Sequence, residues 1–247
     1  MRICVSGTGS QGKSTFIKDF LEEWSIYKTP ETSYRDSLKG QHSKKTTKKV
    51  QEKILNHMID EIQKYTVDDN IIFDRGPLDN LAYTMWAYSK NQGDIDDEFV
   101  DKCVTLVRET LKLVDIIFYI PITKAAAVEY DTASFRKDKK KGLTDENYRI
   151  EIDNIFKAFK RDWDVNPESK FFDPRDKPAI IEIFGEPLER IEIVKLYLDV
   201  DGDPIGGEGS MDNIVTPEML AEVEGLKQGF GIEDSQSQAY KNPKGLQ

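Results

Sequence analysis

The stretch RICVSGTGSQGKS (residues 2–14) decides the fold of this chain. Residues 7–14 match the pattern G-x-x-x-x-G-K-[ST] at every fixed position. The apolar run 2–6 before them is typical of a buried strand, and residues 13–24 after them have apolar side chains at helical spacing. In this order of elements, the backbone N–H groups of the loop and of the first helical turn converge on an anion. The sequence therefore predicts a phosphate-binding loop.

The residue types in the loop indicate a nucleoside triphosphate bound with Mg²⁺. Gly7 and Gly12 permit the positive φ angles that turn successive N–H groups inward. Lys13 is expected to reach the β and γ phosphates, and the Ser14 hydroxyl to ligate Mg²⁺. We therefore expect ATP and Mg²⁺ as cofactors, and expect the following residues to bind them: Gly7, Thr8, Gly9, Ser10, Gln11, Gly12, Lys13, Ser14 and Thr15. The loop alone does not separate a motor, a switch GTPase and a small-molecule kinase.

Further along the chain, short apolar runs alternate with amphipathic stretches. The expected strands are 2–6, 26–31, 70–76, 115–122 and 178–185. The expected helices are 13–24, 44–65, 78–89, 95–113, 144–163 and 187–198. Almost continuously apolar strands separated by helices predict a parallel sheet that is covered on both faces. We expect an α/β fold of the P-loop NTPase type, with three α/β/α layers and five parallel strands in the order 2-3-1-4-5.

A second motif, IIFDRGPLD (residues 71–79), indicates what happens to the phosphate. Asp74 ends an apolar strand, where a carboxylate can hold Mg²⁺ or accept a proton from an attacking hydroxyl. Arg75 follows it, and a guanidinium binds phosphate oxygens in a bidentate manner. The alternative is an ordinary turn before Gly76 and Pro77, which would explain the aspartate but not the arginine.

With these two motifs the chain resembles the P-loop nucleoside and nucleotide kinases, which include the thymidylate and deoxynucleoside kinases. The segment FDRGPLDNLAY (73–83) is also similar to NadR-like small kinases and to phage-encoded kinase-like ATPases. The resemblance covers residues 1–198. It implies ATP-dependent phosphoryl transfer, with Lys13, Asp74 and Arg75 in the catalytic site and with Ser14 and Asp74 at the metal.

The same resemblance implies residues for the acceptor and for a lid. Glu31 and Arg35, in KTPETSYRD (28–36), would contact the acceptor together with Arg75, although Pro30-Glu31 reverses the usual Glu-Pro order. A lid over about 123–147 would bring Arg136 to the triphosphate. The alternatives are an exposed helix start at 28–36 and a solvated basic loop at 134–141.

Composition limits the partners and suggests a second region. The formal net charge of −10 does not favour a protein that coats nucleic acid. No apolar run approaches the roughly 20 residues of a membrane span, and no signal peptide is evident. Cys4 and Cys103 lie in apolar segments, as expected of reduced thiols in a cytoplasm, which would be the host's if a phage encodes the chain. Residues 199–247 are acidic, and we interpret them as an appendage to a kinase domain at 1–198. A homodimer, in which the appendage packs on a second subunit, is an alternative to its packing on the same chain.

The leading hypothesis is phosphoryl transfer from ATP to a small nucleoside or nucleotide, and a deoxynucleoside monophosphate is favoured because Arg35 and Arg75 add positive charge. A second hypothesis is a kinase for a modified base or an end in DNA, which the lysines of segment 44–53 would bind. A third is a regulatory nucleotide-binding ATPase that transfers phosphate only to water. Acceptor-independent turnover would point to this last hypothesis.

Overall fold

The computed structural model describes residues 1–33, 46–123 and 146–205. Its sheet consists of the parallel strands β1 (Arg2–Ser6), β2 (Ile71–Asp74), β3 (Ile116–Tyr119) and β4 (Ala179–Glu182), in the order β2-β1-β3-β4. The register pairs Val5 with Asp74 and Ser6 with Tyr119. The phosphate loop therefore leaves the sheet between the carboxyl ends of its two neighbours.

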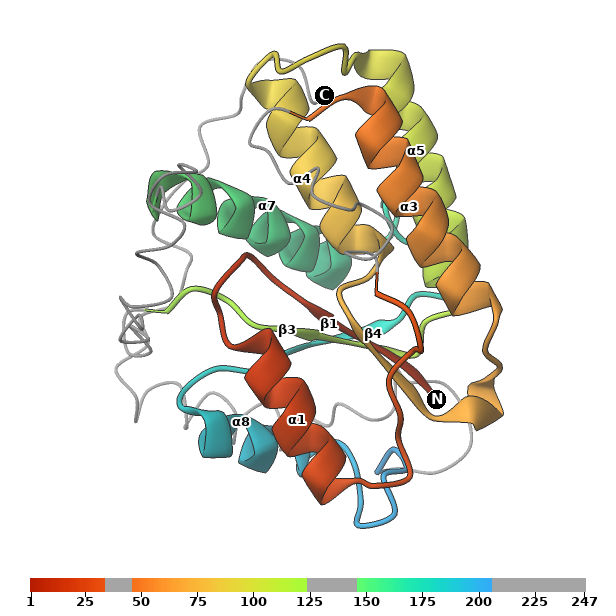
Figure 1. The fold of residues 1–247 in the computed structure, drawn as a ribbon, viewed down its shortest axis with the longest axis vertical. Coiled ribbons are helices and arrows are strands. Elements are labelled where there is room, and N and C mark those ends of the chain that lie inside the picture. Colours follow the sequence, from red (N-terminus) through yellow and green to blue (C-terminus); the bar gives the residue numbers. More distant parts are fainter. Residues whose placement is uncertain (34–45, 124–145, 206–247) are drawn as a thin grey trace.

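Helices cover both faces of this sheet (Figure 1). They are α1 (Lys13–Glu23), α3 (Lys48–Gln63), α4 (Pro77–Ser89), α5 (Asp97–Leu111), α7 (Glu146–Val165) and α8 (Pro187–Val194), with a 3₁₀ turn, η1 (Val67–Asp69), before β2. Helices α3, α4, α5 and α7 lie on one side of the sheet, and α1 and α8 lie on the other. The expected α/β/α layers are confirmed, as are the positions of all six helices.

Local sequence explains where several helices begin. Thr47 accepts a hydrogen bond from the Val50 N–H at the start of α3, and Asp96 does the same for Phe99 in α5. Helices α4 and α8 begin at prolines, where the missing N–H costs no helical hydrogen bond. These elements are therefore bounded by their own residues as well as by packing.

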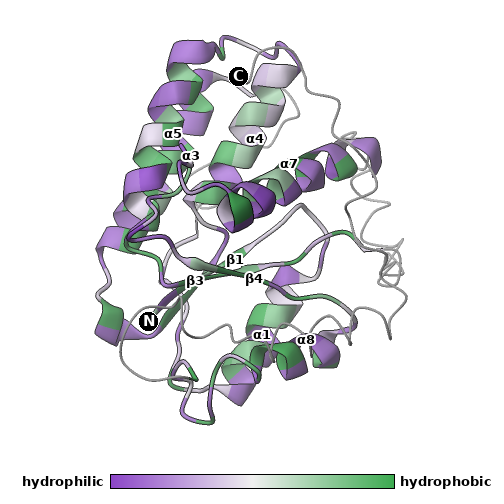
Figure 2. Ribbon diagram, turned by 180° about the vertical axis from the view of Figure 1, so that it is seen from behind, coloured by the Kyte–Doolittle hydropathy of each residue, from purple (hydrophilic) through white to green (hydrophobic). Residues whose placement is uncertain are grey.

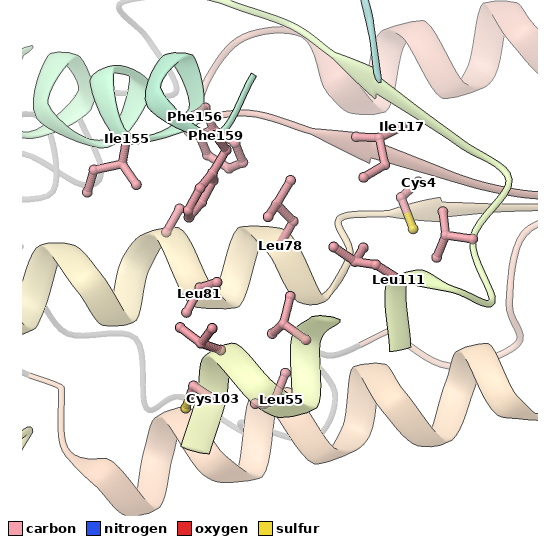
Figure 3. Packing of buried hydrophobic residues seen from close by; sticks show 14 of the residues in the cluster. Cys4, Leu55, Leu78, Leu81, Cys103, Leu111, Ile117, Ile155, Phe156 and Phe159 are labelled. Carbon is pink, nitrogen blue, oxygen red and sulfur yellow. The ribbon is translucent and has the colours of Figure 1, made fainter. Parts of the chain in front are cut away.

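Two apolar cores hold the layers together, one on each face of the sheet. On the larger side, Cys4 and Ile117 of the sheet face Leu78 and Leu81 of α4 and Phe156 of α7, with side chains that point toward one another (Figure 3). On the other side, Phe16 and Phe20 of α1 pack against Phe118, with ring centroids 5.6 and 6.0 Å apart. Figure 2 shows the apolar residues concentrated at the sheet and the polar ones on the outer helix surfaces. The sheet and its loops are thereby fixed from both sides.

The prediction of a fifth strand at 26–31 is wrong, because the described sheet has four strands. Lys28 alone bridges to Ile71, through Lys28 N–H to the Asn70 carbonyl (3.0 Å) and Ile72 N–H to the Lys28 carbonyl (2.9 Å). The next donor of a parallel ladder would be residue 30, which is a proline without an N–H. The segment therefore lies beside β2, where the predicted order places it, but it makes only one rung.

The residues after α8 return to the body of the domain. Trp24 Nε1 donates to the Asp199 carbonyl (2.7 Å) and the Tyr27 hydroxyl donates to the Gly202 carbonyl (2.8 Å). The division at residues 198 and 199 stays a prediction, and most of the expected appendage, residues 206–247, lies outside the described residues. Within the described ranges, no helix is both long and apolar enough to cross a membrane.

Candidate functional site

The loop between β1 and α1 has the backbone that an anion cradle requires. Gly7 and Gly12 have φ angles of 135° and 73°. A Cβ atom added at Gly7 would lie 2.6 Å from the Ile120 carbonyl oxygen, so this position has no space for a side chain. Nothing lies within 4 Å of a Cβ added at Gly9. The loop is therefore tightly packed where it leaves β1 and open at its middle.

The start of helix α1 is suited to a negatively charged group. Within the described part of the chain, no side chain caps α1 at Gly12, and its first turn contains no acidic residue. The N–H groups of that turn and the helix dipole thus favour an anion. The Thr8 Oγ1 atom is buried and has no hydrogen-bond partner among the described residues. Together with Lys13, these groups fit the phosphates of a nucleotide.

Four basic side chains from four parts of the fold hold the carbonyl groups of the loop. Lys13 Nζ donates to the carbonyl oxygens of Gly7 and Thr8, the first of these at 2.8 Å. Arg75 Nη1 also donates to the Gly7 carbonyl, at 3.1 Å. Lys13 and Arg75 thereby bind the first two carbonyl groups of the loop.

The other two cations come from distant helices. Arg149 of α7 donates from Nε to the Gly9 carbonyl (3.0 Å) and from Nη2 to the Ser10 carbonyl (3.4 Å). Arg190 of α8 donates from Nη1 to the Gln11 carbonyl (2.8 Å). Burial lowers the pKa of both guanidinium groups, but arginine side chains remain protonated in proteins. They add positive charge around the cradle.

A cavity of about 270 Å³ opens beside the loop. Its polar wall brings together Ser14 from α1 and Asp74 and Arg75 from the end of β2. Its other lining residues are Ile17, Thr29, Pro30, Thr32, Ser33, His57, Met58, Glu61, Ile62 and Phe73. The cavity thus begins at the end of the phosphate loop and has the mixed polar and apolar lining of a small-molecule site.

Ser14 and Asp74 suit a Mg²⁺ ion that is bound mainly through the nucleotide. Mg²⁺ in such sites takes one or two protein oxygens and completes its shell with phosphate oxygens and water. Among the described residues, no group of three histidine, cysteine or acidic side chains could hold a metal by itself. The donor set therefore fits a metal that arrives with the triphosphate.

One acidic side chain on α3 lines the cavity. Glu61 is 5% exposed and accepts hydrogen bonds from Lys64 and from Thr32 Oγ1, the latter at 2.9 Å. Burial would raise the pKa of Glu61, but the hydrogen bonds from Lys64 and Thr32 outweigh it and lower that pKa. One helical turn earlier, His57 also lines the cavity, and its buried Nε2 has no hydrogen-bond partner within the described ranges. These groups could bind hydroxyl or amine groups of a ligand.

The structure thus gathers part of the predicted site. Residues 7–15 form the loop and the start of α1, and Ser14, Asp74 and Arg75 line one cavity. Glu31 is exposed and does not line it, although Thr32 does. Arg35 and Arg136 lie outside the described residues, as do most of the predicted lid and the lysine-rich segment up to residue 45. The roles of all these residues stay predictions.

Sequence reasoning did not single out Asp79, Arg149 and Arg190. Asp79 had a local signal, because it lies four residues after Arg75 in the same motif and at the acidic N3 position of a helix that begins with proline. Arg149 and Arg190 had none. They lie 140 and 179 residues from their partners in the loop, and only the packing of α7 and α8 brings them there.

Comparison with known proteins agrees with this geometry. A family model described as an AAA domain matches residues 2–165. Deoxyadenosine kinase from M. mycoides, solved with dCMP and dCDP, superposes with a TM-score of 0.55 at 17% identity, over 78% of this chain and 96% of that one. NadR, solved with NAD and AMP-PNP, superposes with a TM-score of 0.48 at 12% identity, over 97% of this chain and 51% of that one. Thymidylate kinase from Candida albicans gives 0.40 at 15% identity over 95% of each.

A search of curated proteins found no match. At 17% identity the deoxyadenosine kinase structure shows the fold alone, and at that level it confirms the expected resemblance. The family match covers the phosphate loop, the Asp74-Arg75 motif and all of α7. The chain therefore belongs to this AAA domain family, and its fold is that of the P-loop nucleoside and nucleotide kinases.

Proposed function

We propose that this protein transfers the γ-phosphoryl group of ATP to a small nucleoside or nucleotide acceptor. One observation carries the proposal: Ser14, Asp74 and Arg75 line the same cavity, directly beside the phosphate loop. A protein that passes phosphate only to water needs no such chamber. The fold similarity to M. mycoides deoxyadenosine kinase supports the same class of reaction.

Each residue at the junction has a part in this proposal. The loop N–H groups and Lys13 bind the triphosphate and stabilise its developing charge. Ser14 and Asp74 would hold Mg²⁺, which supplies charge neutralisation at the phosphates when bound. Asp74 can alternatively accept the proton of an acceptor hydroxyl. Arg75 would clamp phosphate oxygens, and Arg136 stays the proposed cation of the lid.

The acceptor itself is bound in the cavity, in this proposal, by groups from α3 and from segment 29–33. The deoxynucleoside monophosphate favoured by the sequence depends on Arg35 and Arg75. In the described cavity, Arg75 is paired with Asp79 (3.0 Å), while Glu61 and Asp74 contribute carboxylates. These charges favour an acceptor whose buried part is uncharged, so nucleosides belong in the test beside monophosphates.

The experiment is a panel of nucleosides, nucleoside monophosphates and DNA ends, each mixed with the full chain, Mg²⁺ and labelled ATP. We expect ATP consumption to rise sharply with one class of small acceptor, and to fall with Asp74→Asn in that reaction. Turnover that is equal with and without every acceptor would contradict the proposal and favour an ATPase.

A further inference from the structure

Asp79 is a buried carboxylate that the proposed chemistry does not use. It lies in the first turn of α4 and is 1% exposed. Its Oδ2 accepts from Ser6 Oγ (2.7 Å) and from the Gly76 N–H (3.2 Å). Its Oδ1 accepts from the Gly7 N–H (3.3 Å) and from Arg75 Nη1 (3.0 Å). Four donors around a buried carboxylate match its ionised form, which only accepts hydrogen bonds.

These four donors belong to different parts of the site. Ser6 ends β1, Gly7 begins the phosphate loop, Gly76 precedes α4, and Arg75 lines the cavity. Burial raises the pKa of Asp79, whereas Arg75 and Lys13 act in the opposite direction. A single carboxylate thereby connects the phosphate loop with the wall of the cavity.

Arg75 has an unfavourable backbone conformation, which the contacts of its side chain must stabilise. Its φ angle is 81°, in the left-handed region that residues other than glycine rarely adopt. Strain of this kind persists only where the surroundings hold it, and it concentrates at functional sites. Here the guanidinium is held by Asp79 and by the Gly7 carbonyl, and it lies 5.2 Å from the centre of the Tyr83 ring. The conformation aims the side chain back at the loop.

We propose that Asp79 is a positioning residue that holds Arg75 against the phosphate loop and thereby couples nucleotide binding to the acceptor cavity. The inference rests on the proposed function for its effect on turnover. Its effect on the loop does not depend on that function, because Asp79 and Arg75 both bind the backbone of Gly7.

A merely structural aspartate is available for comparison in the same chain. Asp153 of α7 is also 1% exposed and accepts from the Tyr119 hydroxyl (2.8 Å), the Ile122 N–H (3.2 Å) and Lys157 (2.9 Å). Burial raises its pKa as well. It matches Asp79 in burial and also accepts hydrogen bonds from several donors. Its charge acts on Arg149, whereas the charge of Asp79 acts with Arg75 and Lys13.

The test is a double-mutant cycle of Asp79→Asn and Arg75→Met, with Asp153→Asn as the matched control. We expect Asp79→Asn to lower kcat/KM for the acceptor by roughly 100-fold, the size of effect that misplacing a site group can have. In the Arg75→Met background the same change should do little more, because its target is gone. Asp153→Asn should lower the melting temperature, and any change that it makes in kcat/KM should be the same with and without Arg75.

Two results would contradict the inference. Effects of Asp79→Asn and Arg75→Met that multiply independently, or an Asp79→Asn variant that only melts earlier, as the control does, would overturn the inference. If Asp79→Asn does not fold, Asp79→Glu replaces it, since this change keeps the charge but displaces the carboxylate by one methylene. If the wild type phosphorylates no acceptor, the proposed function fails, and the same cycle is measured on the affinity for a non-hydrolysable ATP analogue.

Discussion

The phosphate loop and the acceptor cavity meet at Ser14 but are built in opposite ways. The loop is a contiguous segment, and its carbonyl groups are bound by Lys13, Arg75, Arg149 and Arg190. The cavity is assembled from α1, segment 29–33, α3 and the end of β2, and His57 Nε2 inside it has no partner among the described residues. Hydrogen-bonded carbonyl groups hold the loop in place, whereas buried polar groups without a partner among the described residues, Thr8 Oγ1 in the loop and His57 Nε2 in the cavity, are available to a ligand. From this difference we propose that the loop is preformed for the nucleotide and that the cavity determines which acceptor is bound.

Among the substitutions that test this difference between loop and cavity, we expect the largest effect from Lys13→Ala. The change removes the cation that binds two loop carbonyls and that is expected to bind the phosphates. Stabilising groups of this kind contribute roughly 100- to 1000-fold to kcat. We expect turnover to fall by that amount while the domain still unfolds cooperatively in a thermal melt. A variant that melts like the parent and keeps more than about a tenth of the activity would place the phosphates elsewhere.

A matched pair of glycines tests whether the loop is preformed. Gly7→Ala would place a Cβ 2.6 Å from the Ile120 carbonyl oxygen at a φ of 135°, so it should abolish ATP binding or lower it severely. Gly9→Ala meets nothing within 4 Å, so its affinity for nucleotide should remain close to that of the parent. Calorimetric titration with an ATP analogue measures both. Equal affinities for the two variants would show that the loop rearranges on binding.

A pair of glutamates on α3 tests the cavity. Glu61→Gln removes a carboxylate inside it, and we expect the KM for the acceptor to rise about tenfold, as one hydrogen bond to a charged group is worth about 1.5 kcal/mol. The affinity for ATP should stay the same. Glu52→Gln is the control, because Glu52 lies on the same helix but at the surface, where it pairs with Lys102 (2.7 Å). An unchanged KM in Glu61→Gln would remove this carboxylate from the acceptor site.

The smallest effect is expected from the carboxyl-terminal region. Truncation after Ile205 keeps the contacts of Asp199 and Gly202 with Trp24 and Tyr27, and it should retain turnover. Truncation after Leu198 removes both hydrogen bonds, which contribute about 1 kcal/mol each, and Tyr27 lies two residues before the cavity residue Thr29. We expect this shorter chain to melt earlier and to bind the acceptor more weakly. If the first truncation destroys turnover in a folded protein, residues 206–247 complete the site and the domain division is wrong.

Sequence alone predicted the helices, four of the strands and the loop because their signals are local, and the connection rules of parallel sheets then gave the layers and the strand order. The pattern of residues 7–14 and the apolar runs of β1 and β2 need no knowledge of distant residues. The strand at 26–31 was wrong because the apolar pattern did not show how early Pro30 interrupts the ladder. Arg149 and Arg190 could not be predicted, because a charged residue on a helix face looks the same whether it meets water or a loop 140 residues away. Glu61 was not singled out for the same reason.

The most direct test of the central claim is the fate of the γ-phosphoryl group itself. ATP labelled at that position is incubated with Mg²⁺, the full chain and the best acceptor of the panel, and the labelled products are separated and identified. The account predicts that the label appears on the acceptor in step with ADP formation, and that Asp74→Asn abolishes most of this transfer. Label that appears in inorganic phosphate alone, at a rate the acceptor does not change, would contradict it.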